Sequence, residues 1–360
     1  MNTQQPESLS EAATIIPMAP TTPPHRANNT LPPHTHNLDG VEPVDILRLF
    51  ITTPLLQEMA VNTNAYAQQK MTDTTEDVGR KWKEVTPEEL GVWLGITIYM
   101  GVHCTPAGRD YWKHDGLNPT HPITNYMSQT QFEQIKRYFH VNHPEDPLHS
   151  STGRRLWHSK VDRILEQLRK SSKAYQMPST HIALDEAMIQ ATGHSPDTYK
   201  MPRKPIEQGF KFHVVAEHGY VWDFHSTSNQ VGPDPVPSIE GLTATGQVVN
   251  HLVSQLPRSK YWMVYLDNFY TTLPLLGRLL NNFQIGGCGT ERPSLAGFPP
   301  ELKGSKQDIT KHEYHTMQTM SLSDSAVHEG VGALLWFDNA PVTFMSTVHE
   351  LASTVERIRK

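Results

Sequence analysis

The chain has 360 residues, of which 37% are hydrophobic and only 19% are charged, and its formal net charge is −6. This acidic balance excludes a globally basic, histone-like binder of nucleic acid, so any contact with DNA must come from a local basic patch. Two cysteines exclude a disulfide framework and a cysteine-rich zinc module, and they favour a reducing compartment. No apolar run reaches the length of about 18 residues that a membrane span needs, and the polar start is unlike a signal peptide.

Residues 1–42 are rich in proline and lack apolar periodicity, which predicts a disordered tail. Residues 43–178 follow, and their apolar side chains recur at helical spacing. Thr86-Pro-Glu-Glu predicts a helix start, because Thr86 caps, proline suits the first turn and Glu89 completes a capping box. The apolar run over 90–102 then predicts a buried helix. We therefore expect a helical N-terminal region over 43–178.

The pattern changes near residue 179 to short β-branched and aromatic runs. The predicted elements are strands at 181–185, 210–216 and 220–225, a helix at 248–256, a strand at 261–266, a helix at 272–282, a strand at 283–288, and a final hairpin of 333–337 and 342–347. The 261–266 strand is nearly all apolar, as expected for a central strand buried on both faces. The order β-β-β-α-β-α-β predicts a ribonuclease H-like mixed sheet over 179–360. Residues 291–330 are polar and irregular, which indicates an insertion.

Two acids stand out by their position in this order. Asp185 ends the first predicted strand and Asp267 follows the central one. If those strands are neighbours, both carboxylates project at the same edge, where open α/β sheets place their sites. Two carboxylates that close repel each other, and a divalent cation such as Mg²⁺ removes the repulsion. For either residue taken alone, capping of a nearby loop is the more common role.

A basic segment lies just after Asp185. Lys200, Arg203, Lys204 and Lys211 could hold DNA phosphates beside the acids. A solvated loop explains the same composition equally well.

Seven segments together resemble the piggyBac transposase family over roughly residues 44–350. They are LDEAMI from Leu184, MPRKPIEQGFK from Met201, LDNFYTT from Leu266, GGCGTER from Gly286 and WFDNAPVTFMST from Trp336, with EELGVWLGITIYMG from Glu88 and MSQTQFEQI from Met127 upstream. Each segment is short, but their order and spacing are specific.

The resemblance implies a nuclear, DNA-binding recombinase with a ribonuclease H-like fold, an acidic triad and Mg²⁺ or Mn²⁺. Family members cut DNA at terminal repeats and rejoin it at TTAA targets, and a homodimer is the expected assembly. Asp185 and Asp267 match the first two acids and would bind the metal. His349 stands at the position expected for the third, where it brings no negative charge at neutral pH. Glu350 is the nearest substitute, and Asp338 and Glu356 are more remote.

Typical family members also continue into a cysteine-rich zinc module, which two cysteines cannot form. Three functions follow as alternatives. The first is cut-and-paste transposition by DNA cleavage and strand transfer. The second is a domesticated or decayed copy that binds DNA without cutting it, and the third is a protein-interaction scaffold. His349 favours the second over intact transposition.

Overall fold

The computed structural model describes residues 40–72, 81–116, 119–146, 159–191, 193, 195, 197–202, 204–227, 235–258, 260–292, 298–304, 312, 316–322 and 330–349. Most of the predicted tail lies outside these residues. The chain divides into a helical unit and a sheet unit, and the division falls between Ser172 and Lys173. Within the described residues, no helix is both long and apolar enough to cross a membrane.

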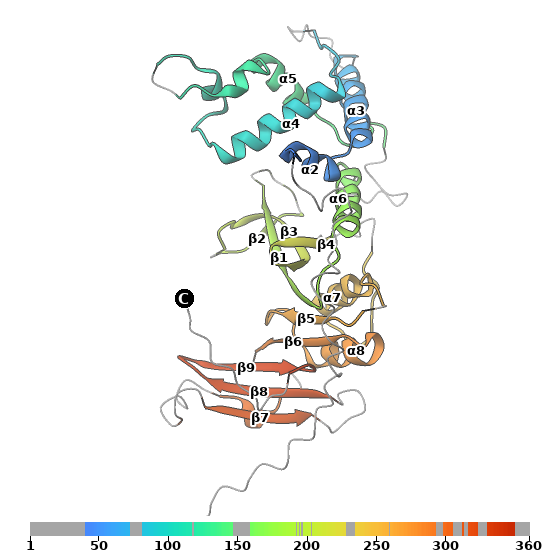
Figure 1. Cartoon of the computed structure of the whole chain (residues 1–360), viewed down its shortest axis with the longest axis vertical. Coiled ribbons are helices and arrows are strands. Elements are labelled where there is room, and N and C mark those ends of the chain that lie inside the picture. The colour runs from blue at the N-terminus through green and yellow to red at the C-terminus, as the bar shows by residue number, and fades with distance from the viewer. Residues whose placement is uncertain are drawn as a thin grey trace, which may run out of the picture. The chain divides into compact units, whose positions relative to one another are not determined.

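The helical unit is built from helices that bury one shared apolar cluster (Figure 1). Its elements are α2 (Pro43–Phe50), α3 (Thr53–Thr72), α4 (Pro87–Val102), the 3₁₀ turns η2 (Gly108–Trp112) and η3 (Pro122–Asn125), α5 (Gln129–Tyr138) and α6 (Asp162–Tyr175), at whose C-terminal end the two units divide. The cluster includes Met59 of α3, Leu90 of α4 and Ile135 of α5, all nearly inaccessible to water.

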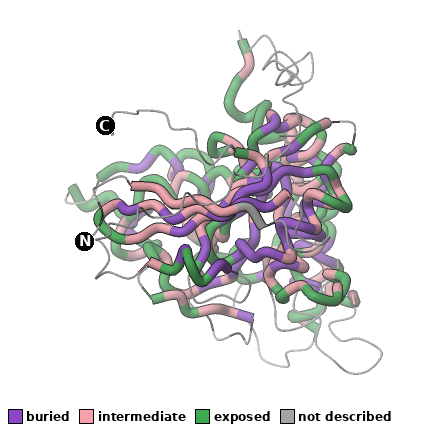
Figure 2. The backbone as a smooth tube through the Cα atoms, turned by 90° about the horizontal axis from the view of Figure 1, so that it is seen from below, coloured by how far each residue is buried: buried purple, intermediate pink, exposed green. Residues whose placement is uncertain are grey.

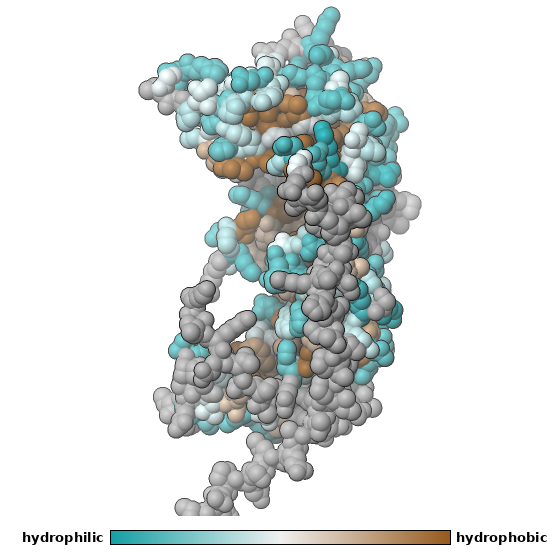
Figure 3. All heavy atoms as spheres, in the orientation of Figure 1, coloured by the Kyte–Doolittle hydropathy of each residue, from teal (hydrophilic) through white to brown (hydrophobic). Residues whose placement is uncertain are grey.

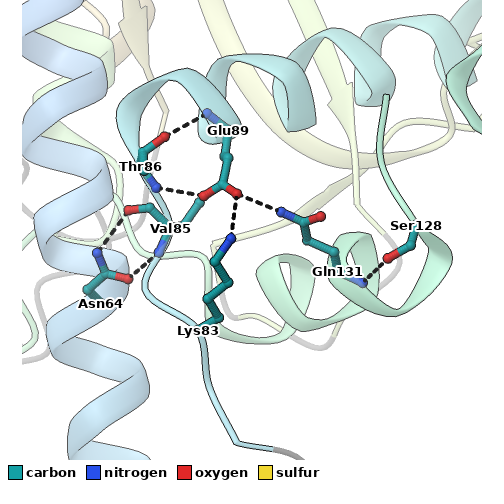
Figure 4. A network of polar contacts seen from close by, with 7 residues as sticks. All are labelled: Asn64, Lys83, Val85, Thr86, Glu89, Ser128 and Gln131. Atoms are coloured by element: carbon teal, nitrogen blue, oxygen red, sulfur yellow. Dashed lines mark hydrogen bonds and ion pairs between the residues drawn. The ribbon is translucent and has the colours of Figure 1, made fainter. Parts of the chain in front are cut away.

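The start of α4 has the predicted capping box (Figure 4). Glu89 N–H donates to Thr86 Oγ1 over 3.1 Å, and Thr86 N–H donates to the Glu89 carboxylate over 3.0 Å. The same carboxylate accepts a hydrogen bond from Gln131 of α5 (3.1 Å) and lies 3.4 Å from the Lys83 ammonium. The bond from Thr86, followed by Lys83, lowers the pKa of Glu89. A local helix-start signal therefore also joins two helices.

One apolar surface of the helical unit remains open to water. Hydrophobic side chains gather over this unit in Figure 3. On α4, Val92, Ile98 and Val102 have exposed fractions of 38%, 53% and 73%. The predicted buried helix is thus buried along one side only, through Leu90, Trp93 and Ile96.

The sheet unit holds one mixed, nine-stranded sheet, and this confirms the predicted fold class. Its elements are β1 (His181–Gln190), β2 (Tyr199–Lys200), β3 (Gln208–Glu217), β4 (Tyr220–Ser226), α7 (Ala244–Ser254), β5 (Met263–Leu266), α8 (Leu273–Phe283), β6 (Gly286–Glu291), η4 (Pro300–Leu302), β7 (Met317–Leu322), β8 (Val331–Phe337) and β9 (Pro341–Ser346). The strand order is β2-β3-β1-β5-β6-β9-β8-β7, and β4 pairs with β3. Only the β1–β5 and β5–β6 pairs are parallel.

Helices α7 and α8 cover one face of the central strands. Val249 and Leu252 of α7 and Leu276 of α8 pack with Leu184 of β1 and Leu266 of β5 in one buried cluster. Buried segments concentrate in this interior, as Figure 2 shows in purple. Along β5, buried residues alternate with half-buried ones, so the prediction of a strand fully buried on both faces was wrong.

Two strand boundaries differ from the sequence prediction for a physical reason. The first strand does not end at Asp185 but continues to Gln190, because β3 pairs antiparallel with β1 from Ala183 through Gln190. The predicted irregular insertion contains β7, which pairs with β8 at the end of the sheet. Pairing with a distant neighbour supplies the backbone hydrogen bonds in both cases, and local periodicity does not report it.

Gly289 of β6 lies where the backbone approaches other atoms too closely for a side chain. A Cβ at this position would stand 2.2 Å from Thr271 Oγ1 and 2.5 Å from the Leu266 carbonyl oxygen. The backbone atom cannot move without shifting β5 just before Asp267.

We therefore predict that Gly289→Ala lowers the free energy of unfolding by about 1–3 kcal/mol, the usual cost of overpacking. Chemical denaturation measures it. Gly95→Ala in α4 is the matched control, because no atom lies within 4 Å of the added Cβ, and helix propensity predicts a gain of up to about 1 kcal/mol. A Gly289→Ala protein as stable as wild type would contradict the close approach.

Glu291 is a buried acid at the end of β6. It is 5% exposed, and its carboxylate accepts a hydrogen bond from Arg292 N–H over 3.1 Å. Burial, only partly offset by Arg292, raises the pKa of Glu291 to about 7. The folded protein therefore holds this proton at pH values where the unfolded chain has lost it.

This predicts that stability falls as pH rises from about 4.5 to about 8, since the native state binds more protons in that window. At about 1.4 kcal/mol per pKa unit, the loss approaches roughly 3 kcal/mol. Glu291→Gln should remove this part of the pH dependence, as measured by denaturation at pH 5 and pH 8. Glu301→Gln, at an exposed position of the same unit, is the control. Equal pH dependence in wild type and Glu291→Gln would refute the prediction.

Candidate metal and nucleic-acid site

The β1–β5 pairing places Asp185 and Asp267 side by side. Leu184 and Leu266 are the last partners in this parallel register, and Asp185 and Asp267 directly follow them in the chain. Both acids are exposed to solvent. The two acids thus follow neighbouring strands, at the C-terminal end of the β1–β5 pairing. Their role in metal binding and catalysis stays a prediction.

The two acids are held by different local structures. Asp185 lies within β1, and its Oδ1 accepts a 2.7 Å hydrogen bond from Glu186 N–H. Asp267 begins a turn, because its carbonyl oxygen accepts hydrogen bonds from Tyr270 N–H (3.0 Å) and Thr271 N–H (3.1 Å). Thr290 Oγ1 of β6 lies 3.5 Å from Asp267 Oδ1. Asp185 is therefore fixed by a strand, whereas Asp267 depends on the geometry of a turn.

Sequence reasoning missed a polar cluster behind these acids, on the side of the sheet that the helices cover. Glu186 of β1 pairs in register with His213 of β3, and His213 Nδ1 lies 2.6 Å from the hydroxyl of Tyr270. Burial, then the carboxylates of Glu186 and Asp185, raises the pKa of Tyr270. The adjacent Asp185-Glu pair and the aromatic residues after Asp267 were the available signals, but neither reveals which side chains meet.

The predicted basic residues differ in their exposure to solvent. Lys200 is exposed on β2, and Lys204, also exposed, lies 3.8 Å from the Glu186 carboxylate. Lys211 is instead buried, with its ammonium 4.1 Å from the centre of the Phe269 ring. Burial lowers the pKa of Lys211, and Glu186 opposes that shift. Lys211 is therefore not part of an exposed basic surface, and Arg203 lies outside the described residues.

His349 lies beside Tyr265 of β5. Its Nε2 is 3.4 Å from the Tyr265 hydroxyl, which also lies 3.0 Å from His181 Nδ1. His181 begins β1 four residues before Asp185, which is roughly 13 Å along a strand at about 3.3 Å per residue. The segment after β9 therefore brings His349 beside Tyr265, two residues before Asp267, and among the described residues His349 forms no three-membered metal-binding group with the two acids. Glu350 and Glu356 lie outside the described residues.

The donor set at the acid pair suits a hard cation. Among the described residues, no group of three or more histidine, cysteine, aspartate or glutamate side chains could hold a metal ion. Asp185 and Asp267 nevertheless supply two solvent-accessible carboxylates at adjacent positions. Mg²⁺ commonly binds to one or two carboxylates and completes its shell with water and substrate phosphate. The pair therefore fits one such ion.

Comparisons with known proteins agree with this architecture. A profile of the family described as Transposase IS4 matches residues 42–360. The human "PiggyBac transposable element-derived protein 5" is 29% identical over 186 residues, which are 52% of this chain and 34% of that protein. The cryo-EM structure of a piggyBac transposase synaptic complex with hairpin DNA matches with a TM-score of 0.71 at 18% identity.

That match covers 88% of this chain and 63% of the solved chain, and it shows a shared fold. The chain spans about a third of the length of its human relative. The likeness to piggyBac proteins confirms the resemblance that the sequence motifs predicted. Since the family profile covers most of its length, the chain belongs to the Transposase IS4 family.

Proposed function

We propose that this chain is a piggyBac-type DNA-binding protein whose Asp185–Asp267 pair binds a divalent cation for phosphodiester cleavage. The observation that carries the proposal is the parallel register that brings the two exposed acids to adjacent positions. A bound Mg²⁺ or Mn²⁺ would stabilise negative charge on phosphate oxygens during phosphoryl transfer. The chain's own contribution is to hold two carboxylates together before the cation arrives.

Lys200 and Lys204 are the basic residues proposed to contact the DNA backbone. Both are exposed, and Lys204 lies beside Glu186, the neighbour of Asp185. The membership of the family and the synaptic complex of the solved relative support DNA as the partner. From the family resemblance, we also propose that the protein is nuclear and forms a homodimer.

A second candidate function is DNA binding without cleavage. It is favoured by the place of His349, which lies beside Tyr265 and, among the described residues, joins no group of three metal-binding side chains. Among the described residues the acid edge offers two carboxylates, enough for one ion with waters, whereas a second ion needs further negative charge. Metal binding and DNA cleavage therefore have to be measured separately.

Metal binding should raise thermal stability, because a cation that binds only the folded state stabilises by RT ln(1 + [M]/Kd). We predict that Mn²⁺ or Mg²⁺ raises the melting temperature of wild type but not of Asp185→Asn or Asp267→Asn. Glu301→Gln should respond like wild type. An unchanged metal response in both aspartate variants would rule out this pair as the site.

The same proteins should then be tested for nicking of supercoiled plasmid that carries TTAA sites. Metal-dependent nicking that disappears in Asp185→Asn supports the enzyme. Metal binding and DNA binding without nicking support the second candidate.

For DNA contact, neutralising one lysine that binds phosphate should lower the slope of log K against log salt concentration by about one. We predict this for Lys204→Ala and Lys200→Ala, measured by fluorescence anisotropy on duplexes of two unrelated sequences. Lys303→Ala, at an exposed position outside the site, should leave the slope unchanged. A slope that stays at the wild-type value in both site variants would show that these lysines form only a solvated surface.

A further inference from the structure

Tyr270 occupies the turn that carries Asp267. It is completely buried, and it lies between Asp267 and Thr272, the residue that caps α8. Its backbone N–H donates to the Asp267 carbonyl oxygen over 3.0 Å and so closes the turn. A shift of the Tyr270 side chain therefore moves the backbone of the turn that carries Asp267, three residues earlier in the chain.

The Tyr270 hydroxyl reaches across to the strand pair that carries Asp185. It lies 2.6 Å from His213 Nδ1, and the two rings meet edge to face with centres 5.5 Å apart. His213 is the register partner of Glu186, the residue after Asp185. Burial lowers the pKa of His213 to about 3, with Lys211 adding to the effect, so the imidazole is neutral at physiological pH. The hydroxyl and the neutral imidazole thus form a fully buried hydrogen bond, and the Glu186 side chain hydrogen-bonds the same hydroxyl.

This hydrogen bond joins the Asp267 turn to the β1–β3 pair. The distance between these two elements determines how far apart Asp267 and Asp185 lie. Asp185 belongs to the β1–β3 pair, whereas Asp267 lies just beyond the last β1–β5 register pair, where sheet pairing no longer holds it. Without a cation the two carboxylates repel each other. A tether from the Asp267 turn to β3 opposes that separation.

We propose that Tyr270 is a positioning residue, whose hydroxyl holds the Asp267 turn against β3 through His213 and so keeps Asp267 beside Asp185 before a cation binds. The inference deepens the proposed function and rests on it for the role of the two acids. The tether itself does not depend on that function.

Tyr265 of β5, five residues before Tyr270, provides a matched comparison. Its hydroxyl contacts His181 and His349, so it too joins a strand residue to histidines. Its partners are His181, at the start of β1, and His349, and neither belongs to the Asp267 turn. Tyr265→Phe therefore removes the same chemical group without touching the Asp267 turn.

The test compares wild type, Tyr270→Phe and Tyr265→Phe by amide hydrogen exchange without metal and by Mn²⁺ titration. Loss of the Tyr270–His213 hydrogen bond should speed exchange within 267–272 by up to about tenfold in Tyr270→Phe. Mn²⁺ affinity should fall by a similar factor. Tyr265→Phe should change neither. Unchanged exchange in Tyr270→Phe would overturn the tether.

A third variant separates positioning from general stability. Tyr270→Phe leaves His213 buried without this partner, whereas Tyr270→Phe/His213→Leu replaces both polar groups by apolar ones, which is close to neutral for stability. We expect the double variant to regain melting temperature while exchange in the turn stays fast and Mn²⁺ binding stays weak. Recovery of Mn²⁺ affinity together with melting temperature would show that Tyr270 only fills the core. If wild type binds no Mn²⁺, the proposed function fails, and the exchange data alone still decide whether the tether exists.

Discussion

The parallel pairing of β1 with β5 is the constraint on which the site depends. Four register pairs, from His181–Met263 to Leu184–Leu266, align two strands that are some 80 residues apart in the chain. Because both strands run in the same direction, the next residue of each, Asp185 and Asp267, reaches the same edge. A shift by one residue would turn the side chains of a whole strand to the other face and separate the acids.

The helical layer fixes that register from one side. Leu184 and Leu266 belong to the cluster that α7 and α8 bury, so each acid follows a residue anchored in the core. Side chains alternate along a strand, and for this reason Asp185 points away from the layer while Glu186 points toward it. The same alternation exposes the acid pair and places the Tyr270–His213 contact directly behind it.

Charge at this edge is arranged in two layers. The exposed layer holds Asp185 and Asp267, which are available to solvent and cations. The buried layer holds Lys211 against Phe269, near Glu186. Buried polar groups of this kind persist in a fold when they are paired or hydrogen-bonded. The inner layer therefore supports the edge, and the outer layer is left for ligands.

Local signals in the sequence were sufficient for the cap at Thr86 and the approximate positions of most helices and strands, because each depends on neighbouring residues. The order of those elements then indicated a mixed sheet. Tertiary structure decided the rest. Only pairing with β3 extends β1 to Gln190, and only pairing with β8 makes a strand of 317–322. Which lysine is buried, where His349 lies and which hydroxyl meets His213 depend on contacts between residues that are 57 to 84 positions apart. Periodicity and propensity describe one element at a time, and such contacts form only when packing brings separate elements together.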